Sequence, residues 1–146
     1  NVITRAVEAE LFPALRRCGM AFYAYNPLCG GLLTGKHKFE DVDAHKTGRF
    51  NGNTWAKTYR GRFWKKKNFE ALEAITDIVN DVHPGATPTD VALRWLCHHS
   101  ALCAQLGDAV IVGASKSGHL EQNLTSLAGA PLDPKVVEVM DQAWAS

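Results

Sequence analysis

The sequence predicts an α/β protein with parallel strands, and three observations point to this fold class. Two short apolar runs, residues 20–25 and 108–113, have the composition of buried strands. A long stretch with helical periodicity separates them, and a loop and helices follow each run. This order predicts a parallel sheet that is buried on both faces. Two strands cannot complete such a sheet, so we expect the chain to be part of a larger β/α fold.

The first element expected is a helix over residues 5–18. Its apolar face comprises Val7, Leu11, Leu15 and Cys18. Gly19 is suited to end this helix, and Pro13 should bend it or divide it into two pieces. The aromatic-rich run at residues 20–25 then forms the first strand.

Loops and helices fill the long stretch between the two strands. Residues 26–36 are rich in Pro and Gly, and residues 37–53 are polar and irregular, which predicts a long surface loop. A helix is expected at residues 54–66, and a second is indicated by the apolar stripe Phe69, Leu72, Ile75, Ile78 and Val82. Thr87 predicts the N-cap of a third helix, because Pro88 follows at its first helical position.

The C-terminal part begins with the second strand, centred on residues 110–112. Helices are expected after it at residues 118–128 and 134–144. Asp133 should cap the last helix, since Pro134 follows it directly.

The composition favours one domain over residues 1–146 and argues against several classes of protein. Apolar residues make up 46% of the chain, which is enough for a core. A formal net charge of +1 argues against a nucleic-acid-binding surface, and the longest apolar run, residues 109–112, is far shorter than the ~18 residues of a membrane helix. The four cysteines favour a reducing, cytoplasmic setting in which the thiols are apolar fillers. The chain starts without Met or a signal peptide, so we expect it to belong to a longer protein.

The loop at residues 26–36 is the first candidate site, because active sites of β/α folds lie at the carboxyl ends of the strands. Gly30, Gly31 and Gly35 allow a close approach of the backbone, and their amides could face a phosphate. Lys36 could add a positive charge. The alternative is a flexible surface loop, which is at least as common.

The segment after the second strand is the other candidate. It leads from Gly113 into a helix through Ser115, Lys116 and Ser117, which suits an anion. The alternative, equally favoured by these residues alone, is that one of the serines caps the helix.

Together the two segments resemble the C-terminal half of an aldo-keto reductase, nearest to the branch of the aflatoxin-aldehyde and succinic-semialdehyde reductases. The resemblance is carried in order by VEAELFP (7–13), FYAYNPL (22–28), GGLLTGK (30–36), GRF (48–50), YRGRFW (59–64), ALRW (92–95), VIVG (110–113) and LEQNL (120–124). It implies a partial (β/α)8 TIM barrel whose N-terminal half is absent from this chain.

The resemblance also implies NADPH as the cofactor. In the family, the loop matching residues 26–36 wraps the pyrophosphate, and the positions matching Arg49 and residues 113–121 hold the adenosine end and its 2′-phosphate, with Gln122 and Asn123 near the adenine. The residues implied in cofactor binding are Asn26, Pro27, Leu28, Gly30, Gly31, Leu32, Leu33, Thr34, Gly35, Lys36, Arg49, Gly113, Ser115, Lys116, Ser117, Glu121, Gln122 and Asn123. Arg49, Ser115 and Lys116 are suited to a phosphate monoester, which favours NADPH over NADH.

Tyr59 and Arg62 match positions that reach the substrate carboxylate in this branch. An Arg fork suits bidentate recognition of a carboxylate, and a Tyr hydroxyl adds one hydrogen bond. The alternative is a solvated helix face, because residues 59–67 interleave aromatic and basic side chains. Nucleic-acid binding is disfavoured, since no binding fold surrounds this cluster.

A metal site is not expected. Cys97, His98, His99 and Cys103 are close in sequence, but their spacing matches no common zinc pattern. Cys29 stands where the branch commonly has Ala, and a thiol beside the cofactor could be sensitive to oxidation.

Catalytic residues are not expected in this chain. The family's catalytic Tyr, Lys, Asp and His belong to the N-terminal half of the barrel, and no motif that carries them is present. We therefore expect part of an NADPH-dependent aldehyde reductase that is inactive as residues 1–146 alone, with a small aldehyde as substrate and a homodimer left open. The alternative is a non-catalytic binding or regulatory protein, as in the potassium-channel β-subunits of the same superfamily.

Overall fold

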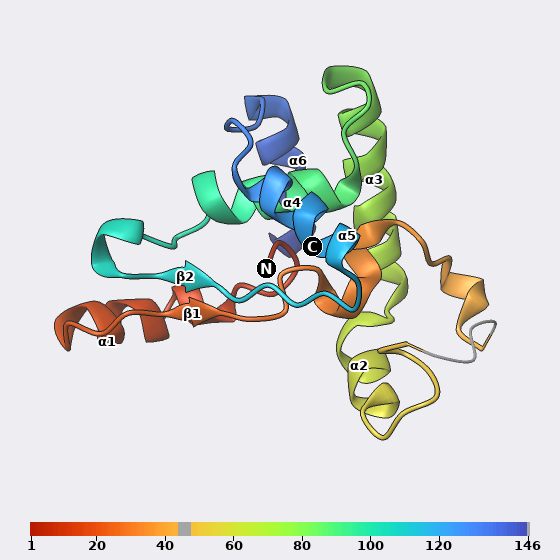
Figure 1. The fold of residues 1–146 in the computed structure, drawn as a ribbon, viewed down its shortest axis with the longest axis horizontal. Helices are drawn as coiled ribbons and strands as arrows, with labels where there is room; N and C mark the ends of the chain where they lie inside the picture. The colour runs from red at the N-terminus through yellow and green to blue at the C-terminus, as the bar shows by residue number, and fades with distance from the viewer. Residues whose placement is uncertain (44–47, 146) are drawn as a thin grey trace.

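The fold is described by a computed structural model for residues 1–43 and 48–145 (Figure 1). The predicted surface loop at residues 37–53 thus includes residues 44–47, which lie outside the described part. The α-helices are α1 (Leu11–Arg17), α2 (Ala56–Phe63), α3 (Lys66–Val82), α4 (Pro88–His98), α5 (Ser117–Leu127) and α6 (Pro134–Ala145). The strands are β1 (Tyr23–Ala24) and β2 (Ala109–Val110). Short 3-10 helices are η1 (Ala6–Glu8), η2 (Cys29–Thr34), η3 (Phe39–Asp41) and η4 (Ala104–Leu106).

The two strands pair in parallel, as predicted, with Tyr23 opposite Ala109 and Ala24 opposite Val110. The ladder extends by a hydrogen bond of 2.8 Å from the Ile111 N–H to the Ala24 carbonyl. Both strands are shorter than the apolar runs that predicted them, because β structure needs a hydrogen-bonding partner at each residue and not apolar composition alone.

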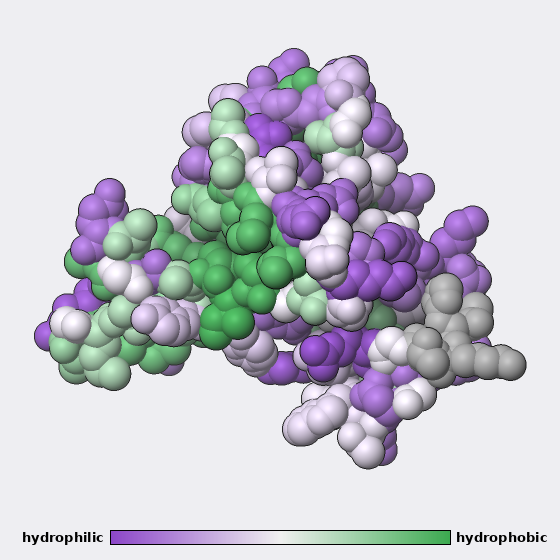
Figure 2. Space-filling model, viewed as in Figure 1, coloured by the Kyte–Doolittle hydropathy of each residue, from purple (hydrophilic) through white to green (hydrophobic). Residues whose placement is uncertain are grey.

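The sheet is not buried on both faces, so that prediction is wrong. Tyr23 is 62% exposed and Ile111 is 52% exposed. Figure 2 shows apolar side chains gathered on this face, over the strands and the segment after β2. Within residues 1–43 and 48–145 no third strand joins the pair, and side chains on the uncovered face therefore meet solvent.

The core lies among the helices. Helix α3 packs on α6 and α4, and α4 also packs on α5 and η2. The predicted stripe of α3 is buried at Leu72 and Ile75, but Phe69, Ile78 and Val82 are half-buried, while Val79 is buried instead. Other buried core side chains are Leu32, Leu33, Val91, Trp95, Val136 and Met140. No helix in the described ranges combines the length and the apolar character needed to cross a membrane.

The two predicted N-cap residues, Thr87 and Asp133, both cap their helices. The Thr87 hydroxyl accepts a hydrogen bond of 3.1 Å from the Asp90 N–H, and Pro88 opens α4 as predicted. The Asp133 carboxylate accepts one of 2.8 Å from the Lys135 N–H at the start of α6. These side chains satisfy amides that a helix leaves unpaired in its first turn.

The first helix departs from its prediction in its apolar face. The helix is divided into η1 and α1, and Pro13 lies in the first turn of α1, where its missing N–H costs no helical hydrogen bond. Phe12 is buried against Phe22 at 4.8 Å between ring centroids, whereas Leu11 and Cys18 are exposed.

Burial of the thiols also differs from the prediction. Cys18 and Cys97 are exposed, Cys103 is half-buried, and Cys29 alone is the apolar filler that the sequence predicted for all four.

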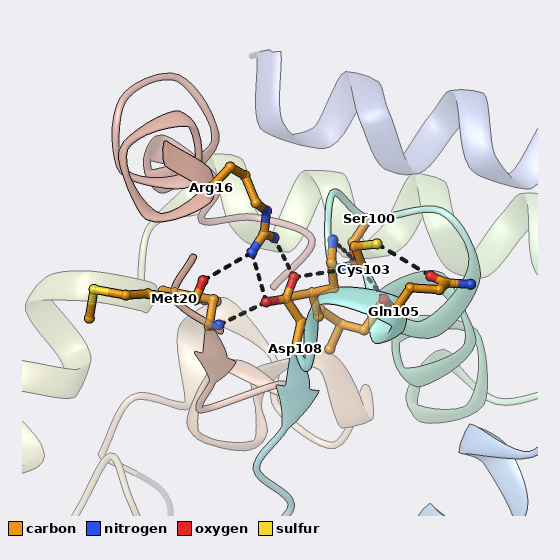
Figure 3. A network of polar contacts seen from close by, with 9 residues as sticks. Arg16, Met20, Ser100, Cys103, Gln105 and Asp108 are labelled. Atoms are coloured by element: carbon orange, nitrogen blue, oxygen red, sulfur yellow. Dashed lines mark hydrogen bonds and ion pairs between the residues drawn. The ribbon is translucent and has the colours of Figure 1, made fainter. Parts of the chain in front are cut away.

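The amino end of β2 is fixed by Asp108 (Figure 3). Its side chain is fully buried and accepts hydrogen bonds from the Arg16 guanidinium, from the Phe22 N–H at 2.7 Å and from the Cys103 N–H at 2.8 Å. Burial alone would raise the pKa of this carboxyl group, but the hydrogen bonds from Arg16, Cys103 and Phe22 outweigh burial and lower the pKa. This network joins α1, β1 and β2 at the end of the sheet away from the predicted site.

Candidate functional site

The candidate site lies at the carboxyl ends of β1 and β2. Because the strands are parallel, the segments that follow them leave the same edge of the sheet and run toward α2 and α5 (Figure 1). Helix α2 reaches this edge through a hydrogen bond of 3.4 Å from Arg62 Nη1 to the Tyr25 hydroxyl. The topology therefore places the predicted cofactor loops and the predicted substrate residues at one edge.

The loop at residues 26–36 is organised by Asn26. This residue adopts a left-handed conformation, with φ of 60°, and its side-chain oxygen accepts a hydrogen bond of 2.8 Å from the Gly30 N–H. Its carbonyl accepts two more, from the Cys29 N–H at 3.1 Å and from Asn1 Nδ2 at 3.2 Å. Leu32 and Leu33 are buried in the core. The loop is therefore anchored to the core, and the alternative of a flexible surface loop is not what the structure has.

The loop glycines do not offer the amides that the sequence suggested. Besides Gly30, the Gly31 N–H donates to the Leu28 carbonyl at 2.9 Å and the Gly35 N–H to the Leu32 carbonyl at 3.2 Å. In this structure each of these three amides is hydrogen-bonded inside the loop and none is free to face a phosphate. A phosphate held here depends on side chains such as the exposed Lys36.

Cys29 is enclosed by this loop. Burial raises the pKa of its thiol to about 12. A buried thiol that stays protonated reacts poorly with oxidants. The structure thus argues against the expectation that Cys29 is sensitive to oxidation.

Arg60 fixes the segment that carries Arg49. Its guanidinium donates to the Phe50 carbonyl at 2.6 Å, to Asp43 at 3.1 Å and to the side-chain oxygen of Asn51. Phe50 is only 2% exposed, so its burial anchors the same segment. The role of Arg60 is not visible in the sequence, since its partners lie outside α2 and no periodic pattern marks them.

Tyr59 joins residues that were predicted for different parts of the site. A Cβ atom at Gly30 would lie 2.6 Å from Tyr59 Cδ1, so the ring rests directly on this glycine. The guanidinium carbon of Arg49 lies 5.6 Å from the centre of the same ring. Gly30, Arg49 and Tyr59 are therefore neighbours, although the resemblance assigned them to the pyrophosphate, the adenosine end and the substrate.

The segment after β2 remains open. Gly113, Ser115, Lys116 and Ser117 are exposed. Helix α5 begins after Lys116 with no side-chain cap, so neither serine has the capping role that was the alternative.

Residues of α5 that were predicted near the adenine differ in their surroundings. Glu121 and Gln122 are exposed, whereas Asn123 is 6% exposed on the helix that packs against α4. Of the two residues predicted near the adenine, Gln122 is therefore exposed and Asn123 is buried.

The cations at this edge differ from the structural arginines in having no carboxylate partner. Ion pairs to Asp or Glu hold Arg5, Arg16, Arg60 and Arg94. Within the described ranges no carboxylate pairs with Lys36, Arg49, Arg62 or Lys116, and all four are exposed. These four cations are therefore available to an anionic ligand.

The histidines near Cys97 bind the backbone. His98 Nε2 lies 2.7 Å from the Gly129 carbonyl, and His99 Nε2 accepts a hydrogen bond of 2.9 Å from the Leu132 N–H. The described residues contain no cluster of three side chains arranged to hold a metal ion.

The model of the Aldo/keto reductase family matches residues 1–145. The chain belongs to the aldo/keto reductase family. This confirms the resemblance, and the family implies a (β/α)8 barrel, with which the two parallel strands and their helices are consistent.

The similar proteins are longer than this chain. It is 54% identical to the mouse protein named Aflatoxin B1 aldehyde reductase member 2, over 99% of this chain and 40% of that protein. Its human counterpart is 52% identical over 99% and 41%, and the human Aldo-keto reductase family 7 member A3 is 50% identical over 99% and 44%. The chain therefore spans about two fifths of the length of these relatives.

Proposed function

We propose that this chain forms the nucleotide-binding part of an NADPH-dependent aldehyde reductase. Membership of the family and the aldehyde reductases among its relatives support reduction of an aldehyde. The observation that carries the choice of ligand is the group of exposed cations without carboxylate partners, Lys36, Arg49 and Lys116, around the carboxyl ends of parallel strands.

The residues present fit a nucleotide with a 2′-phosphate. Arg49 and Lys116 come from separate segments, and neither has a carboxylate partner in the described protein. A doubly charged phosphate ester supplies the anionic partner for both. Ser115, also exposed, adds a hydroxyl donor. Lys36 is the group of this loop that interacts with the pyrophosphate, because the amides of the loop glycines already donate hydrogen bonds inside the loop. The bound nucleotide supplies the hydride, and the chain's own residues bind and orient it.

Arg62 is proposed to bind the carboxylate of an aldehyde that carries one. Its guanidinium is exposed, has no carboxylate partner in the described part, and reaches the strand edge through Tyr25. No residue of this chain is proposed as the proton donor, so residues 1–146 alone should not reduce an aldehyde such as succinic semialdehyde.

Less specific properties stay proposals. A cytoplasmic location, which rests on the cysteine content, and a homodimer also stay proposals. The alternative of a non-catalytic regulatory protein has less support, because the similar proteins named above are named as reductases.

The test is to replace Arg49 or Lys116 by Ala in the natural protein that contains these residues and to titrate NADPH and NADH. Charge-assisted hydrogen bonds contribute ~1.5–3 kcal/mol each, so NADPH should bind roughly 10- to 100-fold more weakly and NADH should change much less. Lys135→Ala, an exposed position at the start of α6, is the control and should change neither. Equal losses for both nucleotides would show that Arg49 and Lys116 are structural.

A further inference from the structure

The ring of Tyr59 is held from several sides. Its Cδ1–Cε1 edge contacts Gly30, where a Cβ atom would lie 2.6 Å from Cδ1 and 2.9 Å from Cε1. The rings of Phe50 and Phe63 lie 6.3 Å and 5.9 Å from it between centroids. Since Phe50 and Phe63 are buried, the position of the Tyr59 ring is set by the core.

The guanidinium of Arg49 packs against this ring. Its guanidinium carbon is 5.6 Å from the ring centre, within the range of a cation–π interaction. Because no carboxylate pairs with Arg49 in the described residues, its aromatic neighbour is the contact that orients it. The backbone of the segment is fixed separately, by the hydrogen bond from Arg60 to the Phe50 carbonyl.

The hydroxyl of Tyr59 takes no part in this arrangement. Among the described residues it makes no hydrogen bond, and the contacts to Gly30, Phe50, Phe63 and Arg49 all involve the ring. The ring and the hydroxyl can therefore be separated by substitution.

We infer that Tyr59 is a positioning residue for Arg49: its ring, resting on Gly30, holds the guanidinium where it meets the 2′-phosphate of the nucleotide. This inference rests on the proposed function. It gives Gly30 a specific reason to lack a side chain, because any Cβ there displaces the ring and the arginine above it. It also links the loop at residues 26–36 to selectivity for the phosphate through one aromatic contact.

The experiment measures binding of adenosine 2′,5′-bisphosphate and of adenosine 5′-monophosphate by calorimetry, in the natural protein that contains these residues. Tyr59→Phe keeps the ring and should bind both probes as the wild type does. Tyr59→Leu keeps apolar bulk without an aromatic face and should bind the bisphosphate about 3- to 10-fold more weakly, with little change for the monophosphate. In Arg49→Ala, the further change Tyr59→Leu should cost nothing more for the bisphosphate.

A second variant distinguishes loss of the cation–π contact from loss of folding. Tyr59→pentafluorophenylalanine keeps the shape of the ring but reverses its quadrupole, so it should also weaken the bisphosphate selectively. Bisphosphate binding that is unchanged in this variant and in Tyr59→Leu, or losses that add to those of Arg49→Ala, would overturn the positioning role alone. A wild-type protein without preference for the bisphosphate would overturn the proposed function, and the inference with it.

Discussion

Gly30→Ala is a change in the candidate site that the structure predicts to be costly. Gly30 has φ of 71°, in the left-handed region, and Tyr59 lies on its open face. A methyl group placed there would be 2.6 Å from Tyr59 Cδ1 and 3.4 Å from Phe50 Cζ. The ring cannot move away freely, because Phe50 is buried against it. The substitution therefore combines backbone strain with a steric conflict.

The two contributions have different sizes. A left-handed conformation costs a residue with a Cβ atom ~1–2 kcal/mol. Overpacking in a well-packed region adds ~1–3 kcal/mol. The free energy of unfolding should therefore fall by about 2–5 kcal/mol.

Gly19→Ala separates these contributions. Gly19 has φ of 63°, close to that of Gly30, but nothing lies within 4 Å of its added methyl group. Urea unfolding followed by circular dichroism should show the backbone cost alone in Gly19→Ala and a clearly larger loss in Gly30→Ala. Equal losses in the two variants would refute the contact between Gly30 and Tyr59.

Further predictions concern two buried side chains, those of Asp108 and Cys29. Asp108→Ala removes the acceptor of two backbone N–H groups and should destabilise the fold by about 3 kcal/mol in urea unfolding at neutral pH, whereas Asp108→Asn, which keeps one acceptor oxygen, should lose less. Because folding lowers the pKa of Asp108, this stabilisation is present above the pKa of an unfolded aspartate (~4) and decreases as the pH falls from there through the pKa of the folded state; a wild-type advantage that does not decrease below pH ~4 would contradict it. Cys29 should react with iodoacetamide ~100-fold more slowly than the exposed Cys18, as followed by mass spectrometry, and comparable rates would contradict its burial. Because folding raises the pKa of Cys29, its thiol should also make the fold less stable as the pH rises above ~8.5.

The order of the elements was predictable because it follows from local patterns. The run around Tyr23, the helical stretch and the run around Val110 were enough to predict parallel pairing. Thr87 and Asp133 could be assigned as caps because a cap depends on residues a few positions away. The exposure of Tyr23 was not predictable in this way, since composition shows that a residue suits burial but not what covers it.

The site was predictable as a region but not in its contacts. Positive φ values at Gly30 and Gly31 follow from residue type, yet the direction of the Gly30 amide is set by the side chain of Asn26. The contact of Gly30 with Tyr59 joins residues far apart in sequence. The same is true of the pair between Arg16 and Asp108, 92 positions apart, for which no local pattern exists.

The uncovered face of the sheet also affects the energetics of the whole molecule. Tyr23, Tyr25 and Ile111 keep more than half of their surface in water, so the ~25 cal/mol per Å² that burial of apolar surface contributes is missing there. Whatever shields these side chains binds the folded chain in preference to the unfolded one, and by mass action it raises the stability of the fold. The melting temperature of residues 1–146 therefore depends on whether these side chains are shielded from water.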